Sequence, residues 1–130
     1  MTHAITVRVY YEDTDLAGIV YYANYLKFIE RARTEWVRSL GIDQNLVRAE
    51  QGVVFAVRRV EADYLKPAVF DDLLQVTTSL VELGGARIVL DQAVLRGELT
   101  LFTARVTLVC LGASGARQVP ADVRAALSAS

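Results

Sequence analysis

Hydrophobic and polar positions alternate near the start of the chain. Ile5, Val7 and Val9 share one face of an extended segment, and polar residues separate them. This two-residue period predicts a strand over residues 5–11. The next stretch, residues 12–22, is rich in aspartate, threonine and glycine, which favour turns because they bond their own backbone or accept unusual dihedral angles. We therefore expect a loop after the first strand.

From residue 24 to residue 40 the apolar positions recur at three- and four-residue steps, which predicts a long helix with a wide apolar face. Such a face favours packing against a sheet. Asn24 is expected to cap the N-terminus of this helix, and Gly41 to end it in a left-handed conformation. Glu30 is expected to pair with Arg33 on the solvent side.

The second half of the chain has the pattern of a sheet. After a short helix that Asp43 caps and that runs to about Glu50, four strands are predicted at 53–65, 72–83, 86–96 and 99–111. Short glycine-containing turns between the last three strands make them antiparallel neighbours. Pro120 is expected to start a final helix over residues 121–127. The prediction is an α+β fold in a single domain, 1–130, with one long helix covered by a curved antiparallel sheet whose edge can pair across a dimer.

Composition narrows the possible chemistry. With 53% hydrophobic residues and a formal net charge of −1, the chain can form a core and has no overall field that would attract nucleic acid. Neither a signal segment nor a long apolar run is present, so we expect a cytoplasmic protein without a membrane span. The single cysteine, Cys110, is expected to pack in the core. The single histidine, His3, is expected in a frayed terminus, which argues against catalysis by histidine and against a histidine-ligated metal.

The residues just before the long helix carry the candidate chemistry. Asp13, Asp15 and Gly18 lie where the free backbone N–H groups and the positive end of the helix dipole would face a ligand. A carbonyl bound there would be polarised, and a nearby carboxylate would attack it or activate water. The spacing alone leaves a simpler alternative open, in which the aspartates only cap the helix and form the turn. A calcium loop is rejected because Ala17 and Asn24 occupy ligand positions, and a phosphatase domain is disfavoured because strands and helices do not alternate.

The same segment, Tyr11-x-Asp13-Thr14-Asp15-x-x-Gly18-Ile19-Val20-Tyr21-Tyr22-x-x-Tyr25, resembles the signature of the hydroxybenzoyl-CoA thioesterase family of hot-dog proteins. The resemblance extends over nearly the whole chain. The Tol-Pal-associated acyl-CoA thioesterase branch is similar in the stretches 28–35, 57–59, 67–68 and 71–72. The resemblance implies a hot-dog fold and hydrolysis of an acyl-CoA to free acid and CoA. It also implies that there is no metal or redox cofactor, that the protein is a homodimer or homotetramer, and that it is linked to the Tol-Pal envelope system.

The resemblance also implies roles for individual residues. Asp15 would be the catalytic carboxylate, as nucleophile or general base, and the backbone N–H near Tyr22 would contact the oxyanion. The Tol-Pal-associated branch usually has histidine at the place of Tyr22, so this tyrosine leaves the acyl group, short-chain or aromatic, open. Gly18 would shape the loop or approach the substrate, and Arg87 would meet the CoA phosphates. Arg58, Arg59 and Lys66 fit a phosphate contact and a solvated strand face equally well.

Two other functions remain possible from the sequence. A non-catalytic acyl-CoA or acyl-carrier binding protein would use the same groove, since a fold does not fix an activity. A hot-dog dehydratase would require a histidine paired with a carboxylate, and His3 is a poor candidate.

Overall fold

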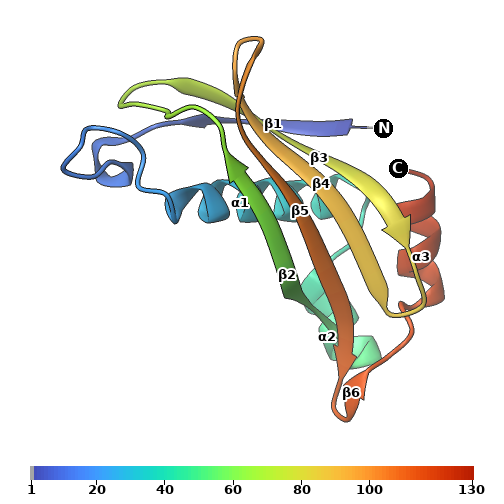
Figure 1. Cartoon of the computed structure of the whole chain (residues 1–130). Coiled ribbons are helices and arrows are strands. Elements are labelled where there is room, and N and C mark those ends of the chain that lie inside the picture. Colours follow the sequence, from blue (N-terminus) through green and yellow to red (C-terminus); the bar gives the residue numbers. More distant parts are fainter. Residues whose placement is uncertain (1) are drawn as a thin grey trace.

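The computed structural model describes residues 2–130, which form a six-stranded antiparallel sheet and three α-helices (Figure 1). The elements in chain order are β1 (Thr2–Arg8), the 3₁₀ turn η1 (Tyr11–Asp13), α1 (Asn24–Ser39), α2 (Gln44–Gln51), β2 (Val54–Tyr64), β3 (Leu73–Leu83), β4 (Arg87–Arg96), β5 (Leu99–Gly112), β6 (Gly115–Ala116) and α3 (Ala121–Ser128). The predicted α+β architecture is confirmed, and the last four long strands and the two short helices agree with their predicted spans within two residues.

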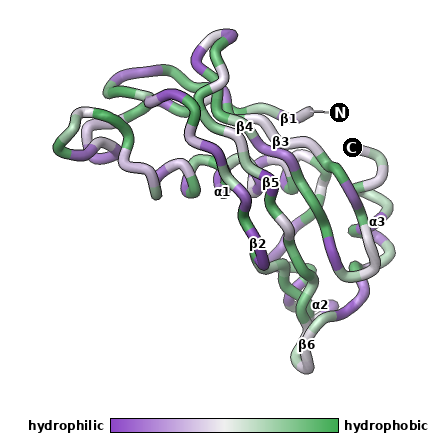
Figure 2. The backbone as a smooth tube through the Cα atoms, viewed as in Figure 1, coloured by the Kyte–Doolittle hydropathy of each residue, from purple (hydrophilic) through white to green (hydrophobic). Residues whose placement is uncertain are grey.

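The sheet has the strand order β1-β3-β4-β5-β2, with β6 paired to the end of β5. It curves around α1, which runs along its concave side (Figure 1). The core between them contains Phe28 and Ile29 of α1 and, from the strands, Leu90 and Val106, all fully buried. Along the strands the chain changes repeatedly between hydrophobic and hydrophilic residues, which is the alternation of a sheet with one covered face (Figure 2). Strand β2 ends the strand order, so one of its edges has no partner within residues 2–130.

The first strand differs from its prediction. It begins at Thr2 and ends at Arg8, because Tyr10 and Asp13 close a tight turn in which the Asp13 carboxylate accepts the Tyr10 N–H at 2.8 Å. This local turn overrides the alternating pattern that extended to residue 11. The expectation of a frayed terminus at His3 was wrong, since His3 pairs with Thr78 in the sheet and its Nδ1 is buried, with no hydrogen-bond partner among residues 2–130.

Two predictions about the long helix were also wrong. Asn24 is the first helical residue and Ala23 occupies the N-cap position, while the Asn24 side chain donates to the Asp13 carbonyl oxygen at 2.9 Å. Arg33 does not pair with Glu30: it turns toward the sheet and donates to Oε1 of the buried Gln92 at 3.1 Å. Burial lowers the pKa of Arg33, and the nearby charge of Glu30 acts in the opposite direction. A buried amide that needs a donor explains why this arginine lies inward.

The helix ends follow their predicted signals more closely. Gly41 has a φ of +80° just after α1, and Asp43 caps α2 by accepting the N–H groups of Asn45 and Leu46. Pro120 lies one residue before α3, at the N-cap position instead of the first helical position. In the part of the chain that the structure describes, no helix is both long enough and apolar enough to span a membrane.

Candidate active site

Asp15 lies at the tip of a small hairpin between η1 and α1. Its backbone N–H donates to the Ile19 carbonyl oxygen, and its carbonyl oxygen accepts the Gly18 N–H, both at 2.9 Å. One carboxylate oxygen, Oδ1, accepts the Ala17 N–H at 2.9 Å. The second oxygen has no hydrogen-bond partner within residues 2–130, and the side chain is only partly buried. The hairpin therefore fixes the carboxylate and leaves one oxygen available for chemistry.

Gly18 closes this hairpin with a φ of +79°, in the left-handed region that residues with a Cβ rarely adopt. A Cβ added there would meet nothing within 4 Å. The backbone conformation, and not crowding within the chain, is what requires glycine at this position. Gly18 thus has the loop-shaping role that was one of its two sequence interpretations.

The N-terminal end of α1 presents an unpaired donor. Within the described residues, the Tyr22 backbone N–H has no acceptor, whereas its carbonyl oxygen accepts the Tyr64 hydroxyl at 2.9 Å. The Tyr22 ring is exposed and lies edge-on to the Tyr21 and Tyr64 rings. A free N–H at the positive end of a 16-residue helix is a suitable donor to a developing negative charge.

Asp13 connects the hairpin with the helix start. Its carbonyl oxygen accepts hydrogen bonds from the Tyr21 backbone N–H and the Asn24 side-chain amide, both at 2.9 Å. Its carboxylate accepts the Tyr10 backbone N–H. These contacts agree with the sequence interpretation of Asp13 as a residue that orders the loop.

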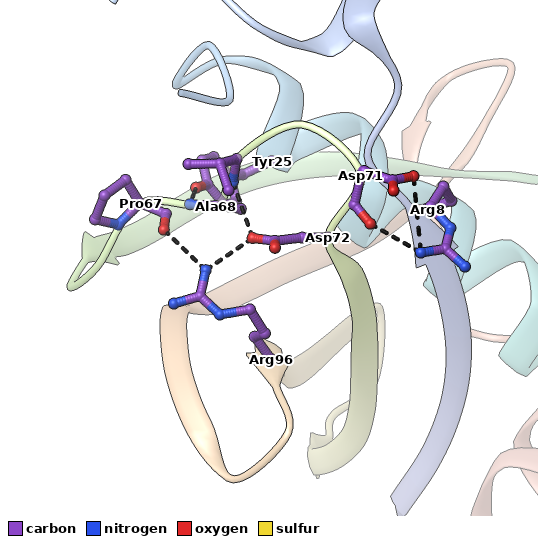
Figure 3. Close-up of polar contacts among 8 residues, drawn as sticks. Arg8, Tyr25, Pro67, Ala68, Asp71, Asp72 and Arg96 are labelled. Atoms are coloured by element: carbon purple, nitrogen blue, oxygen red, sulfur yellow. Dashed lines mark hydrogen bonds and ion pairs between the residues drawn. The ribbon is translucent and has the colours of Figure 1, made fainter. Parts of the chain in front are cut away.

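A second segment, which contains Ala68 and Val69, also holds the hairpin in place. The sequence predicted no such role for it. The Val20 N–H donates to the Ala68 carbonyl oxygen at 2.9 Å, and Ile19 forms a bridge with Val69. The buried Tyr25 hydroxyl accepts the Ala68 N–H at 3.0 Å (Figure 3). Burial raises the pKa of Tyr25, and also that of Tyr64. Tyr25 is the last residue of the signature segment, and the sequence predicted no role for its hydroxyl.

Arg87 is not brought to Asp15 within one chain. It begins β4 and pairs with Glu82 across the β3–β4 turn, with 2.9 Å between Nη2 and the carboxylate. The other end of β4, at Arg96, contacts Pro67 beside the segment that supports the hairpin. At about 3.3 Å per residue the two ends of this strand are roughly 30 Å apart. The β3–β4 turn, beside which Arg87 lies, and the loop before α1 that carries Asp15 are therefore far apart (Figure 1).

A cavity of about 270 Å³ lies between α1, the sheet and the short helices. It is lined mainly by apolar side chains, among them Trp36, Phe55, Val57 and Leu108, and its polar lining includes Glu30 and Arg33. Asp15 is not part of this lining. The cavity can hold the volume of about nine water molecules at roughly 30 Å³ each, which suits a small apolar group.

Cys110 is buried, as predicted, and its Sγ lies 3.7 Å from the Gln118 carbonyl oxygen. Burial raises the pKa of this thiol, which keeps it in the unreactive protonated form. Cys110 is therefore not a candidate nucleophile.

Known proteins are similar to this chain in sequence and in fold. A family model described as the thioesterase superfamily matches residues 17–103. The acyl-CoA thioesterase YbgC of Haemophilus influenzae is 44% identical over 122 residues, which cover 92% of this chain and 90% of that protein. The crystal structure of a probable thioesterase from Bartonella henselae has a TM-score of 0.88 at 38% identity, covering 92% of this chain and 100% of its own. A 4-hydroxybenzoyl-CoA thioesterase variant in complex with 4-hydroxybenzoyl-CoA has a TM-score of 0.89 at 23% identity, covering 97% and 98% of the two chains, a likeness that concerns the fold. The chain therefore belongs to the thioesterase superfamily and is a thioesterase with the hot-dog fold.

Proposed function

We propose that the protein hydrolyses acyl-CoA thioesters to a free acid and CoA, with Asp15 as the catalytic carboxylate and the Tyr22 backbone N–H as the oxyanion donor. Two observations carry this proposal. Within residues 2–130, one Asp15 carboxylate oxygen and the Tyr22 backbone N–H both lack hydrogen-bond partners, and the Asp13 carbonyl oxygen joins the segments that carry them. The relatives named acyl-CoA thioesterases support the choice of substrate.

Two routes give the same products. In the first, the free Asp15 oxygen attacks the thioester carbon, the carbonyl oxygen gains negative charge at the Tyr22 N–H, and CoA leaves as its thiolate. Water then hydrolyses the mixed anhydride, which releases the acid and restores the carboxylate. In the second, Asp15 takes a proton from water and the resulting hydroxide attacks the same carbon. The Tyr22 side chain would only orient groups or donate a hydrogen bond.

The active form in this proposal is a homodimer joined at the free edge of β2, or a tetramer built from such dimers. Val57 and Val60 of this strand are exposed, and unpaired strand edges favour pairing with another chain. In a twofold, antiparallel pair, the Tyr64 end of one β2 lies beside the Phe55 end of the other. Since Tyr64 contacts Tyr22 and Phe55 lines the cavity, the oxyanion donor of one protomer would lie close to the cavity of its partner.

The cavity is then the candidate site for the acyl group. Its volume of about 270 Å³ and its apolar lining fit a short-chain or single-ring aromatic acyl group. Arg87 of the partner protomer is the candidate contact for the CoA phosphates, which would explain why it lies far from Asp15 in its own chain. The cytoplasmic location and the link to the Tol-Pal system stay predictions from the sequence.

Thiol release from a panel of short-chain, long-chain and hydroxybenzoyl CoA thioesters tests the proposal. We expect Asp15→Asn to lower the rate at least about a hundredfold, which corresponds to roughly 2.7 kcal/mol of barrier. The exposed neighbour Glu12 supplies the matched control, and Glu12→Gln should retain the native rate. If the folded native protein binds these thioesters without releasing thiol, the alternative of a non-catalytic acyl-CoA or acyl-carrier binding protein replaces the catalytic proposal.

A further inference from the structure

The peptide groups of Ala68 connect the two halves of the candidate site. The Ala68 carbonyl oxygen accepts the Val20 N–H of the hairpin that carries Asp15, and the Ala68 N–H donates to the Tyr25 hydroxyl in the first turn of α1. Ala68 itself is fully buried. The hairpin and the helix start therefore both depend on the position of one short backbone segment.

That segment, residues 65–72, lies outside the named strands and is held by side chains. The Asp72 carboxylate oxygen Oδ2 accepts the Val69 N–H at 2.9 Å and Nη1 of Arg96 at 2.7 Å. Arg96 also reaches the Pro67 carbonyl oxygen at 3.4 Å (Figure 3). One ion pair thus fixes the segment on both sides of Ala68.

The burial of this pair distinguishes it from other charge pairs of the protein. The Asp72 side chain is 16% exposed and that of Arg96 is 38% exposed, whereas the Asp91–Arg105 pair on the same sheet is 50% exposed on both sides. Loss of one partner from this partly buried pair leaves the other charge with less compensation from solvent than at an exposed pair, so the segment would move to restore solvation. A similar loss at an exposed pair has little effect.

We infer that Asp72, Arg96 and Tyr25 are positioning residues, which act through Ala68 to set the separation between the Asp15 carboxylate and the Tyr22 N–H. This inference rests on the proposed function. None of the three residues needs to touch the substrate. A displacement of about 1 Å between catalytic groups costs up to roughly a hundredfold in rate, so a small shift of the segment has a large kinetic effect.

A double-mutant cycle with Asp15→Asn tests the inference. Asp72→Asn keeps the shape of the side chain and removes the charge, and Tyr25→Phe removes only the acceptor for the Ala68 N–H. We expect each variant to lower kcat about ten- to a hundredfold with KM within about threefold. In the Asp15→Asn background the same changes should alter the residual rate less than about twofold, because there is no longer a carboxylate to position. Asp91→Asn, in the exposed pair, is the matched control and should leave kcat unchanged.

Amide hydrogen exchange gives a readout that does not depend on activity. The Val20 N–H should exchange about tenfold faster in both variants, while the amide of the core residue Leu90 exchanges as in the native protein. An unchanged kcat in folded Asp72→Asn and Tyr25→Phe would overturn the inference, as would an equal loss of rate with and without Asp15. If Asp15→Asn alone keeps the native rate, the proposed function fails instead. Should Asp72→Asn not fold, Tyr25→Phe decides the outcome by itself.

Discussion

The Tyr64 hydroxyl donates a hydrogen bond to the Tyr22 carbonyl oxygen at 2.9 Å, and this contact joins the last residue of β2 to a residue two positions before α1. The two positions are 42 residues apart in the chain. The bond fixes the backbone of the residue whose N–H is the proposed oxyanion donor, and it ties that donor to the strand with the free edge.

Removal of this hydroxyl should impair catalysis more than stability. We expect Tyr64→Phe to lower kcat about three- to tenfold and the free energy of unfolding by about 1 kcal/mol, the usual contribution of one hydrogen bond. Steady-state kinetics and urea unfolding measure the two effects. The control is Tyr21→Phe, since the Tyr21 hydroxyl has no hydrogen-bond partner within residues 2–130. Equal kinetics of the two variants would contradict the prediction.

Gly18→Ala should destabilise the hairpin although there is room for the added methyl group. The left-handed conformation costs about 1–2 kcal/mol for a residue with a Cβ. Activity should fall with the loss of the native Asp15 position, and Gly18→Asn should be milder because asparagine tolerates this conformation better. Urea unfolding and thiol release together check that stability and activity both decrease in the order native protein, Gly18→Asn, Gly18→Ala. An alanine variant as stable as the native protein would show that the hairpin adopts another conformation.

The buried Gln92 should be among the polar residues that are most costly to replace. Its amide donates to the Ile29 carbonyl oxygen and to the Thr78 hydroxyl, both at 2.9 Å, and it accepts from Arg33. Gln92→Leu leaves these groups without partners in the core. We expect a loss of about 2–4 kcal/mol in the free energy of unfolding, measured with urea. The double variant with Arg33→Met should recover part of that loss, because the unpaired cation is then absent.

Asp91 provides a prediction for pH. The hydrogen bonds from Arg105 hold the pKa of this carboxyl below its ordinary value of 3.8. A lowered pKa in the folded state stabilises the protein above the ordinary value, and the contribution is lost as the pH falls through the lowered value. Both side chains are half exposed, so the effect should be below about 1 kcal/mol. The free energy of unfolding should change less between pH 7 and about pH 3 for Asp91→Asn than for the native protein.

The free edge of β2 allows a direct test of the assembly. Val60→Lys places a charge on the exposed edge strand, which disfavours pairing with another chain. We expect sedimentation to show a shift toward monomers together with a loss of thiol release. Val81→Lys, at a similarly exposed position on β3, should keep both the native mass and the native rate. A Val60→Lys protein that remains dimeric and active would exclude this edge as the required interface.

The sequence was sufficient for α1, α2, α3 and the four long strands after α2 and for the position of the loop that carries Asp15, because apolar spacing, Gly18, Gly41 and Asp43 act locally. It was not sufficient for contacts between distant segments. Neither Arg96 nor Asp72 carries a local signal, since their pairing depends on how the β4 end meets the segment after β2. Arg33 was misassigned for the same reason: the buried amide that turns it inward lies 59 residues away.

The donor at the start of α1 belongs to the backbone and not to a side chain. Every amino acid except proline supplies the same N–H at position 22, so the side chain there can change over time while the oxyanion contact is kept. In the proposed mechanism, this freedom would allow a tyrosine or another residue at position 22. In the proposed mechanism, Tyr22→Pro is therefore the substitution that would erase the donor, and variation of the Tyr22 ring is a route by which new substrates can be accepted without rebuilding the catalytic centre.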